Sequence, residues 1–155
     1  MNGPAQAASS DSKAAAGGDW VSAETGRTGF RTALSARSHA FVADEPLSVG
    51  GADTGPTPYE YLLAALAGCM AMTLRMYADR KRWPLERVRI SLRSARSHTK
   101  DCEACETEDV GIHQVERRVE LDGPLTDEQR TRMMQIADRC PVKQSLQREL
   151  RVMDG

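Results

Sequence analysis

The sequence predicts an α+β fold, because the expected elements follow one another as strands, a long apolar helix, two more strands and two final helices. Runs of strands and helices of this kind, without strict alternation, are typical of that class. A chain of 155 residues has the usual length of one domain. We expect a mobile tail rich in Ala, Ser and Gly over residues 1–18, and a single domain over 19–155.

Charge and composition exclude several function classes. Lys and Arg total 21 and Asp and Glu total 22, which gives a net charge of −1. This balance argues against nucleic acid as a partner. We expect no apolar window long enough to cross a bilayer, hence no membrane partner, and residues 1–18 have no apolar core of a secretory signal. A cytoplasmic location follows by default.

The first ordered part of the chain is expected to be a small sheet. A turn at Gly26–Gly29 precedes a run over residues 30–43 that is rich in Thr, Leu, Phe and Val. This pattern predicts a β-hairpin or the first strands of a meander. Residues 44–56 contain several Gly, Pro and Asp residues and are expected to form a long loop.

The clearest predicted element is a helix that begins after Thr57. Thr57 would be the N-cap, Pro58 the first helical residue, and Glu60 the partner that completes a capping box. Residues 61–72 are almost all apolar or small, and Pro84 follows the polar end of the segment. A helix that is apolar on every side is typically buried, so we expect a central helix.

A β-hairpin and two helices are expected after it. Apolar residues alternate over 88–92 and again over 115–121, and an elaborated hairpin tip separates them at about residues 94–111. Thr126 starts a second capping box. The helix behind it presents apolar residues at i, i+3, i+4 and i+7, the last of which is Cys140. Pro141 then starts a short helix, and residues 151–153 could form a closing strand.

Four cysteines are too few for a disulfide scaffold and indicate catalysis, redox chemistry or metal binding. Cys69 is expected within the buried helix, where a free cysteine is usually a small inert hydrophobe. Cys140 is expected at a helix N-terminus, where backbone N–H groups stabilise a thiolate. The two residues could therefore form a peroxidatic and resolving pair, although spacing alone does not bring them together.

Two segments resemble signature blocks of one known family. Residues 55–69 read GPTPYEYLLAALAGC, and residues 137–142 read ADRCPV. Together, in this order, they resemble the OsmC/Ohr family of osmotically inducible and organic-hydroperoxide-resistance proteins, over a stretch from about Trp20 to the C-terminus. The resemblance implies an α+β fold in which antiparallel sheets wrap a buried central helix, and an intertwined homodimer with its active sites at the subunit interface. It also implies reduction of organic hydroperoxides without a metal or other cofactor.

The resemblance assigns roles to individual residues. Cys69 would attack the peroxide bond and become a sulfenic acid, and Cys140 would resolve that acid as a disulfide, which an external dithiol reduces. A thiolate within an apolar helix needs a cationic partner. Arg27, in the turn between the first two strands, matches the family's arginine, and Arg31 and Arg37 are the alternatives.

Glu60 has two interpretations. The family pairs its arginine with a glutamate near the start of the central helix, but its best-known hydroperoxide-resistance members carry that residue one position earlier, where this chain has Tyr59. Glu60 is therefore either catalytic or only a helix cap. Tyr59 favours a rival function, in which an OsmC-fold protein without efficient peroxidase activity binds a small apolar or oxidised ligand at the dimer interface.

The hairpin tip contains a separate Cys-x-x-Cys motif. Cys102 and Cys105 have His98 and His113 nearby in the sequence, and these four residues could form a zinc site. A redox pair is disfavoured because the surrounding acidic residues raise thiol pKa values. An ordinary solvated loop is the favoured interpretation, so no metal is assigned, and a zinc-stabilised interaction protein remains a third hypothesis.

Overall fold

The computed structural model describes residues 20–94, 114–148 and 150–153. Its internal contacts divide the chain into two compact units, Met1–Thr57 and Pro58–Gly155, and each unit is described by itself. The expected tail, and the expected hairpin tip from residue 95 onwards, lie outside the described residues. A single domain over residues 19–155 stays a prediction.

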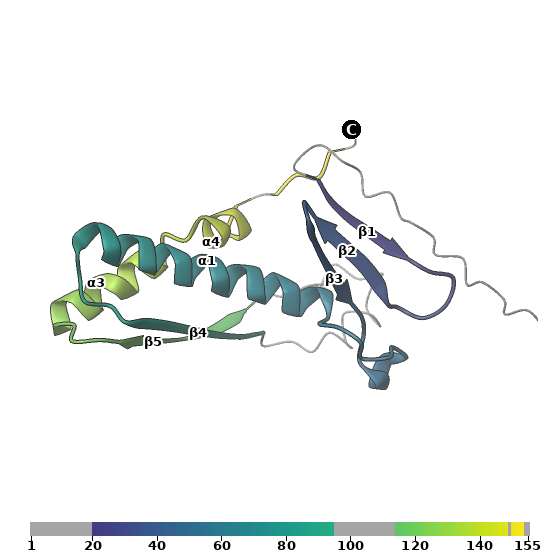
Figure 1. Cartoon of the computed structure of the whole chain (residues 1–155), viewed down its shortest axis with the longest axis horizontal. Helices are drawn as coiled ribbons and strands as arrows, with labels where there is room; N and C mark the ends of the chain where they lie inside the picture. The colour runs from purple at the N-terminus through teal and green to yellow at the C-terminus, as the bar shows by residue number, and fades with distance from the viewer. Residues whose placement is uncertain (1–19, 95–113, 149, 154–155) are drawn as a thin grey trace, which may run out of the picture. The chain divides into compact units, whose positions relative to one another are not determined.

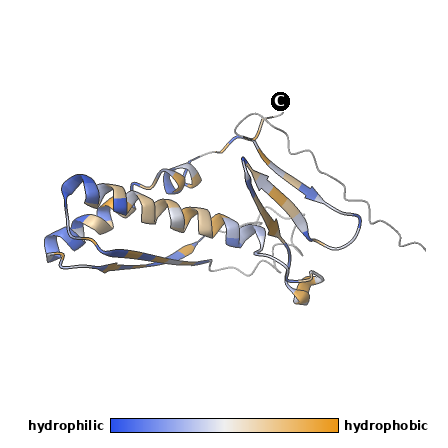
Figure 2. Ribbon diagram, viewed as in Figure 1, coloured by the Kyte–Doolittle hydropathy of each residue, from blue (hydrophilic) through white to orange (hydrophobic). Residues whose placement is uncertain are grey.

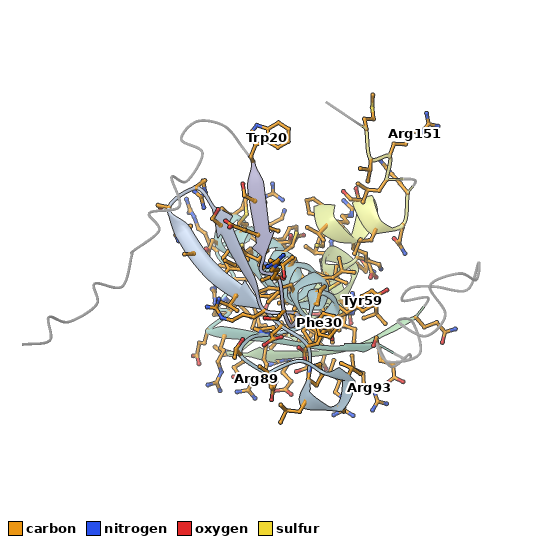
Figure 3. All side chains as sticks on the ribbon, turned by 90° about the vertical axis from the view of Figure 1, so that its right-hand side faces the viewer. Trp20, Phe30, Tyr59, Arg89, Arg93 and Arg151 are labelled. Carbon is orange, nitrogen blue, oxygen red and sulfur yellow. The ribbon has the colours of Figure 1, made fainter. Side chains whose placement is uncertain are left out.

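The N-terminal unit contains a three-stranded antiparallel meander, which confirms one of the two expected arrangements. Its strands are β1 (Val21–Thr25), β2 (Thr32–Ala36) and β3 (His39–Ala43), and they pair in that order (Figure 1). The predicted turn at residues 26–29 joins β1 to β2. All five residues of β1 are exposed, and Figure 3 shows the Trp20 side chain standing off the start of this strand.

The predicted loop over residues 44–56 contains only a short 3-10 helix, Leu47–Val49. Asp44, 2% exposed, holds this loop together. Its carboxylate accepts hydrogen bonds from the backbone N–H groups of Glu45 and Thr54, at 2.8 and 3.1 Å, and from the Thr54 hydroxyl at 2.7 Å. The Thr54 hydroxyl contributes most to lowering the pKa of Asp44, and the loss of hydration opposes it.

The C-terminal unit begins with the predicted long helix, α1 (Pro58–Lys81). One face of α1 is buried, and Figure 2 shows a largely apolar helix that becomes hydrophilic at its last turn. The buried residues are Leu66, Met70, Leu74, Tyr77 and Ala78. Met72 and Met76 are 68% and 71% exposed, so burial within one chain covers only part of the apolar surface that the sequence provides. The capping box of Thr57 and Glu60 stays a prediction.

The expectation of no membrane-length apolar window is wrong. By length and composition alone, α1 could cross a membrane. The core helix of a soluble protein meets the same criterion, because small residues such as Ala and Gly leave such a helix apolar along its whole length.

The helix packs on the predicted β-hairpin, which is formed by β4 (Arg87–Ser94) and β5 (Val115–Asp122). Alternate residues of β4 are partly buried, and those between them are exposed. Arg87, Arg89 and Arg93 on the exposed face pair with carboxylates of β5 at 2.6, 3.0 and 2.7 Å. Figure 3 labels Arg89 and Arg93 on this strand.

Two helices complete the unit. The predicted capping box starts α3 (Asp127–Ala137), because Thr126 and Gln129 exchange hydrogen bonds. Cys140 is the N-cap of α4 (Pro141–Leu146) and Pro141 is its first residue, as expected. The expected closing strand over residues 151–153 is absent from the described structure. Val152 and Met153 are 96% and 83% exposed there, so no packing fixes an extended conformation.

Two apolar clusters lie along α1. The larger one joins the C-terminal half of the helix to α3 and consists of Leu74, Tyr77, Ala78, Leu85, Leu125, Met133, Ile136 and Ala137. The smaller one contains Leu66, Met70 and Cys140, with Cys69, Ile90, Leu92 and Val142 packed against it. Both candidate redox cysteines therefore belong to the smaller cluster.

Candidate active site

The structure brings Cys69 and Cys140 into contact, although 71 positions separate them in the sequence. Cys69 lies in the middle of α1 and is half-buried, whereas Cys140 is fully buried where α3 ends and α4 begins. Both are free thiols. The Cys140 thiol donates a hydrogen bond to the Cys69 sulfur.

The pKa of the Cys69 thiol is lowered. Burial is the largest single effect and raises the pKa, but three hydrogen bonds together outweigh it: from the Cys140 thiol, from the backbone N–H of Val142, and from the Thr73 side chain. Val142 is the second residue of α4, where N–H groups have no partner within the helix. The Thr73 hydroxyl has a single proton, which it shares between the Cys69 sulfur and the carbonyl oxygen of Cys69, 2.8 Å away.

The pKa of Cys140 is raised instead. Burial is the main cause, and the hydrogen bond to Cys69 adds to it because that bond requires Cys140 to keep its proton. The negative charge of the Cys69 thiolate raises this pKa further. The pair is therefore asymmetric: Cys69 is the more acidic thiol, and Cys140 is the one that holds its proton more strongly.

Asp138 holds the short helix that carries Cys140. One of its carboxylate oxygens accepts hydrogen bonds from Arg117 of β5 at 2.9 Å and from Lys143 of α4 at 2.5 Å. The bond from Lys143 contributes most to lowering the pKa of Asp138, burial opposes it, and Arg117 also lowers it. Strand β5 and α4 are thus tied to the residue that ends α3.

A largely apolar pocket of 480 Å³ lies beside the pair. Leu66 and Met70 belong both to its wall and to the cluster around Cys140. The remaining lining residues are Leu62, Leu63, Leu92, Val115, Arg117, Asp138, Lys143, Leu146 and Gln147. Its charged groups are Asp138 and the two cations that Asp138 binds. An apolar molecule with few polar groups suits this lining.

A second, more open pocket of 620 Å³ lies further along α1, and we call it the cationic pocket. Thr73, which contacts Cys69, and Pro141, which follows Cys140, both line it. The other lining residues are Met76, Tyr77, Arg80, Lys81, Arg132, Ile136 and Arg139. Residues next to the cysteine pair therefore line two pockets of different chemistry, although neither cysteine is itself among the lining residues of either pocket.

Glu60 lies elsewhere on α1. It lines a third pocket, of 330 Å³, with residues of α1 and with Ile90, Ser91 and Leu92 of β4. Glu60 precedes Cys69 by nine residues of α1. This spacing places the two side chains about half a turn apart around the helix axis and about 13.5 Å apart along it. The two side chains therefore start from different faces of the helix within one chain, and a catalytic role for Glu60 stays a prediction.

Arg27, Arg31 and Arg37 are exposed residues of the N-terminal unit. Arg27 lies in the predicted turn between β1 and β2, and its pairing with Cys69 stays a prediction. The four residues of the possible zinc site, His98, Cys102, Cys105 and His113, lie outside the described residues. Within the described ranges, no group of three or more His, Cys, Asp or Glu side chains could hold a metal ion.

Sequence analysis missed three groups around the pair. Thr73 follows Cys69 by four residues, and this spacing on a helix could have identified it. Asp138 lies in the ADRCPV segment but received no role, because the two cations that bind it, Arg117 and Lys143, belong to other secondary-structure elements. The contribution of the Val142 backbone N–H does not depend on the identity of a side chain, so no residue type in the sequence indicates it. Only the position of α4 beside Cys69 reveals this hydrogen bond.

Comparisons with known proteins agree with this fold. The model of the family described as "OsmC-like protein" matches residues 50–153, which is more than half of the chain. A search of curated proteins found no match. A solved OsmC-like protein from Mycoplasma pneumoniae is 18% identical, with a TM-score of 0.68 over 85% of this chain and 89% of its own.

Two further solved structures are named organic hydroperoxide resistance proteins. The one from Legionella pneumophila is 19% identical, with a TM-score of 0.61 over 85% of this chain and 90% of its own. The one from Elizabethkingia anophelis is 18% identical, with a TM-score of 0.61 over 81% and 84%. At these identities the likeness concerns the fold, whereas the family model matches the sequence itself. The chain therefore belongs to the OsmC-like family.

Proposed function

We propose that this protein is a thiol-dependent peroxidase that reduces organic hydroperoxides to alcohols. The observation that carries the proposal is the hydrogen-bonded contact of Cys69 and Cys140, with the pKa of Cys69 lowered and that of Cys140 raised. Family membership and the names of the Legionella and Elizabethkingia structures support it.

In the first step, the Cys69 thiolate attacks the terminal, hydrogen-bearing oxygen of the hydroperoxide. A sulfur–oxygen bond forms, the oxygen–oxygen bond breaks, and Cys69 becomes a sulfenic acid. The departing alkoxide takes up a proton from solvent and leaves as the alcohol. The lowered pKa of Cys69 favours this step because only the thiolate attacks.

In the second step, Cys140 resolves the sulfenic acid. Cys140 loses its proton, its sulfur bonds to the sulfur of Cys69, and hydroxide leaves and is protonated to water. The contact seen between the thiols means that little movement is needed. An external dithiol then supplies two electrons and two protons and regenerates both thiols.

The 480 Å³ pocket supports an organic hydroperoxide as the substrate. Its leucine and methionine side chains contact an alkyl or aryl group better than they contact water. We therefore expect bulky organic hydroperoxides to react faster than hydrogen peroxide, and equal rates for both would contradict this preference.

The proposed working form is a cytoplasmic homodimer. Met72 and Met76 leave an exposed apolar face on α1 that a second copy of the chain could cover. In that form Arg27 is the proposed cationic partner of Cys69, with Arg31 and Arg37 as alternatives, and Glu60 is the proposed carboxylate. No metal or other cofactor takes part in the proposed reaction.

Stopped-flow oxidation of the reduced protein by cumene hydroperoxide tests the proposal. We expect fast oxidation and a Cys69–Cys140 disulfide in the wild type, no reaction in Cys69→Ser, and a stable sulfenic acid in Cys140→Ser. The double substitution of Cys102→Ser and Cys105→Ser removes the two remaining thiols and should leave both steps intact. Equally slow oxidation of the wild type and Cys69→Ser would refute the peroxidase.

That second outcome would favour the rival function, a ligand-binding protein. The apolar pocket and Tyr59, in place of the family's glutamate, favour a small apolar or oxidised ligand at the dimer interface. Titration of cumyl alcohol into Cys69→Ser, followed by calorimetry, would measure this binding without the redox reaction.

A further inference from the structure

The wall of the cationic pocket gathers positive charges from separate parts of the chain. Arg80 and Lys81 come from the last turn of α1, Arg132 from α3, and Arg139 from the residues between α3 and α4. Cations in the last turn of a helix complement its dipole, which accounts for Arg80 and Lys81 but not for their meeting with the other two. Arg132 is half-buried and the other three are exposed, so solvent reaches all four.

Nothing in the described ranges neutralises this charge. No described Asp or Glu lines the pocket, and none forms an ion pair with any of its four cations. The acidic residues next to these cations in the sequence are engaged elsewhere, since Asp79 pairs with Arg75 and Asp138 binds two cations of the apolar pocket. Like charges gathered in this way repel one another, and a bound anion relieves the repulsion.

Tyr77 lines the same pocket and lies among three of the cations. The Arg80 and Arg132 guanidinium groups lie 5.6 and 5.9 Å from the centre of its ring, and Arg132 donates a hydrogen bond to its hydroxyl at 3.3 Å. That bond contributes most to lowering the pKa of this tyrosine, burial opposes it, and the charges of Arg132, Lys81 and Arg80 lower the pKa further. These cations therefore stabilise a negative charge placed among them.

Arg132 is held in place and still has donors to offer. Its Nε donates to the Tyr77 hydroxyl, and its Nη1 donates to the side-chain oxygen of Gln135 at 2.7 Å. Its Nη2 donates to no group in the part of the chain that the structure describes. A guanidinium that two hydrogen bonds already hold loses little freedom when its remaining N–H groups bind an anion.

We propose that the part of the cationic pocket formed by Arg80, Lys81 and Arg132 binds a dianionic phosphoryl group, as inorganic phosphate or as a phosphate monoester. Several cations around one dianion match its charge, and guanidinium N–H groups suit the oxygens of a phosphate. The pocket volume of 620 Å³ leaves room for an esterified organic group beside Ile136. The site needs no contact with Met76, the lining residue that belongs to the face for a second copy of the chain.

This binding site goes beyond the proposed function, because no step of the peroxidase reaction uses these three cations. Its presence or absence therefore leaves the peroxidase proposal unchanged. Loss of peroxidase activity in Cys69→Ser likewise leaves phosphate binding intact.

Isothermal titration calorimetry of the full-length protein with inorganic phosphate, at about pH 8 and constant ionic strength set by chloride, tests the inference. We expect one binding site per chain, with an affinity that falls several-fold when chloride is raised from about 0.05 M to about 0.5 M, because salt screens the cations. Phenyl phosphate is titrated in parallel. Tighter binding of phenyl phosphate assigns the site to a phosphate monoester, and equal affinity assigns it to the inorganic ion.

The ionisation of Tyr77 locates the bound anion. The chain has three tyrosines, and the difference in tyrosinate absorbance between wild type and Tyr77→Phe isolates the titration of this one. Bound phosphate neutralises the neighbouring cations, so we expect saturating phosphate to raise the pKa of Tyr77 by about half a unit relative to chloride.

Matched variants separate the pocket from net charge. In the double substitution Arg80→Gln and Lys81→Gln, which leaves Arg132 and its hydrogen bonds in place, we expect phosphate affinity to fall about tenfold. Arg80→Lys with Lys81→Arg keeps both charges and should retain most of the affinity. Arg89→Gln with Arg93→Gln removes the same net charge from the outer face of β4 and should leave the affinity unchanged. Circular dichroism of each variant checks that it is folded.

Three results would overturn the inference. One is the absence of binding of either phosphate by the wild-type protein at low ionic strength. Another is an equal loss of affinity in the β4 control, which would assign the effect to net charge. The third is a pKa of Tyr77 that phosphate does not change, since the anion would then lie elsewhere on the protein.

Discussion

The two halves of α1 are packed in different ways. The C-terminal half places Leu74, Tyr77 and Ala78 in the larger apolar cluster, where Leu74 and Ala78 are fully buried. The N-terminal half has only Leu66 and Met70 in the smaller cluster, beside the two cysteines and the apolar pocket. One helix thus joins a closely packed core to a site that remains open to a ligand.

This difference separates stability from reactivity. A fully packed surrounding would hold Cys69 rigidly but would exclude a hydroperoxide, whereas a loose one would not keep Cys140 and the Val142 N–H in place. The larger cluster anchors the C-terminal half of α1 and α3, and hydrogen bonds position the Cys69 sulfur in the middle of α1. Substitutions in the two halves should therefore differ in kind as well as in size.

The largest expected effect is on stability in the C-terminal half. Leu74→Ala should lower the free energy of unfolding by about 3 kcal/mol, because it leaves a cavity in a filled core. Leu63→Ala, in the half-buried wall of the pocket, should cost about 1 kcal/mol or less, since that side chain already borders open space. Urea unfolding followed by circular dichroism measures both, and similar losses would contradict the comparison.

The next effect concerns Asp138. Asp138→Asn should cost at most about 1 kcal/mol of stability, because the Asp138 side chain is 49% exposed and water screens its ion pairs. We expect a clearer effect on catalysis, with disulfide formation from the Cys69 sulfenic acid slowed several-fold because α4 is held less firmly. Asp122→Asn, which removes a comparable exposed pair on the hairpin, is the control and should not slow this step.

The same residue predicts a pH dependence. The folded state lowers the pKa of Asp138 below 3.8, so its contribution to stability is fully present above the unfolded value. That contribution is lost as the pH falls through the lower, folded value. The difference in unfolding free energy between wild type and Asp138→Asn should therefore shrink in acid, and a difference that grows there would contradict this assignment.

The smallest expected effect is on the acidity of Cys69. Thr73→Val keeps the shape of the side chain but removes one of the hydrogen bonds that lower the pKa of Cys69. The midpoint pH for alkylation of Cys69 by iodoacetamide should rise by a few tenths of a unit, with folding little changed. Cys140→Ala should raise this midpoint more, since it removes the larger of the two side-chain contributions. The reverse order would contradict the assignment.

Sequence patterns predicted most of the C-terminal unit because each pattern is local. The apolar run that ends at Cys69, the alternation of Val88 and Ile90, and the capping box of Thr126 each involve residues close in the chain. The prediction of a closing strand over residues 151–153 was wrong because it, too, used only local information. A strand requires a partner, and nothing within residues 151–153 indicates whether one is available.

The sequence also selected Cys69 and Cys140, chiefly because they stand in the two segments that resemble the signature blocks of the family; position within a buried helix alone favoured an inert Cys69. Their contact, the direction of the hydrogen bond between them and the opposite shifts of their pKa values depend on where α4 lies against α1. The cationic pocket likewise gathers charges from the end of α1, from α3 and from the residues between α3 and α4. Local order follows from neighbours in the chain, whereas burial, hydrogen bonding and electrostatic potential depend on distances that only the tertiary structure decides.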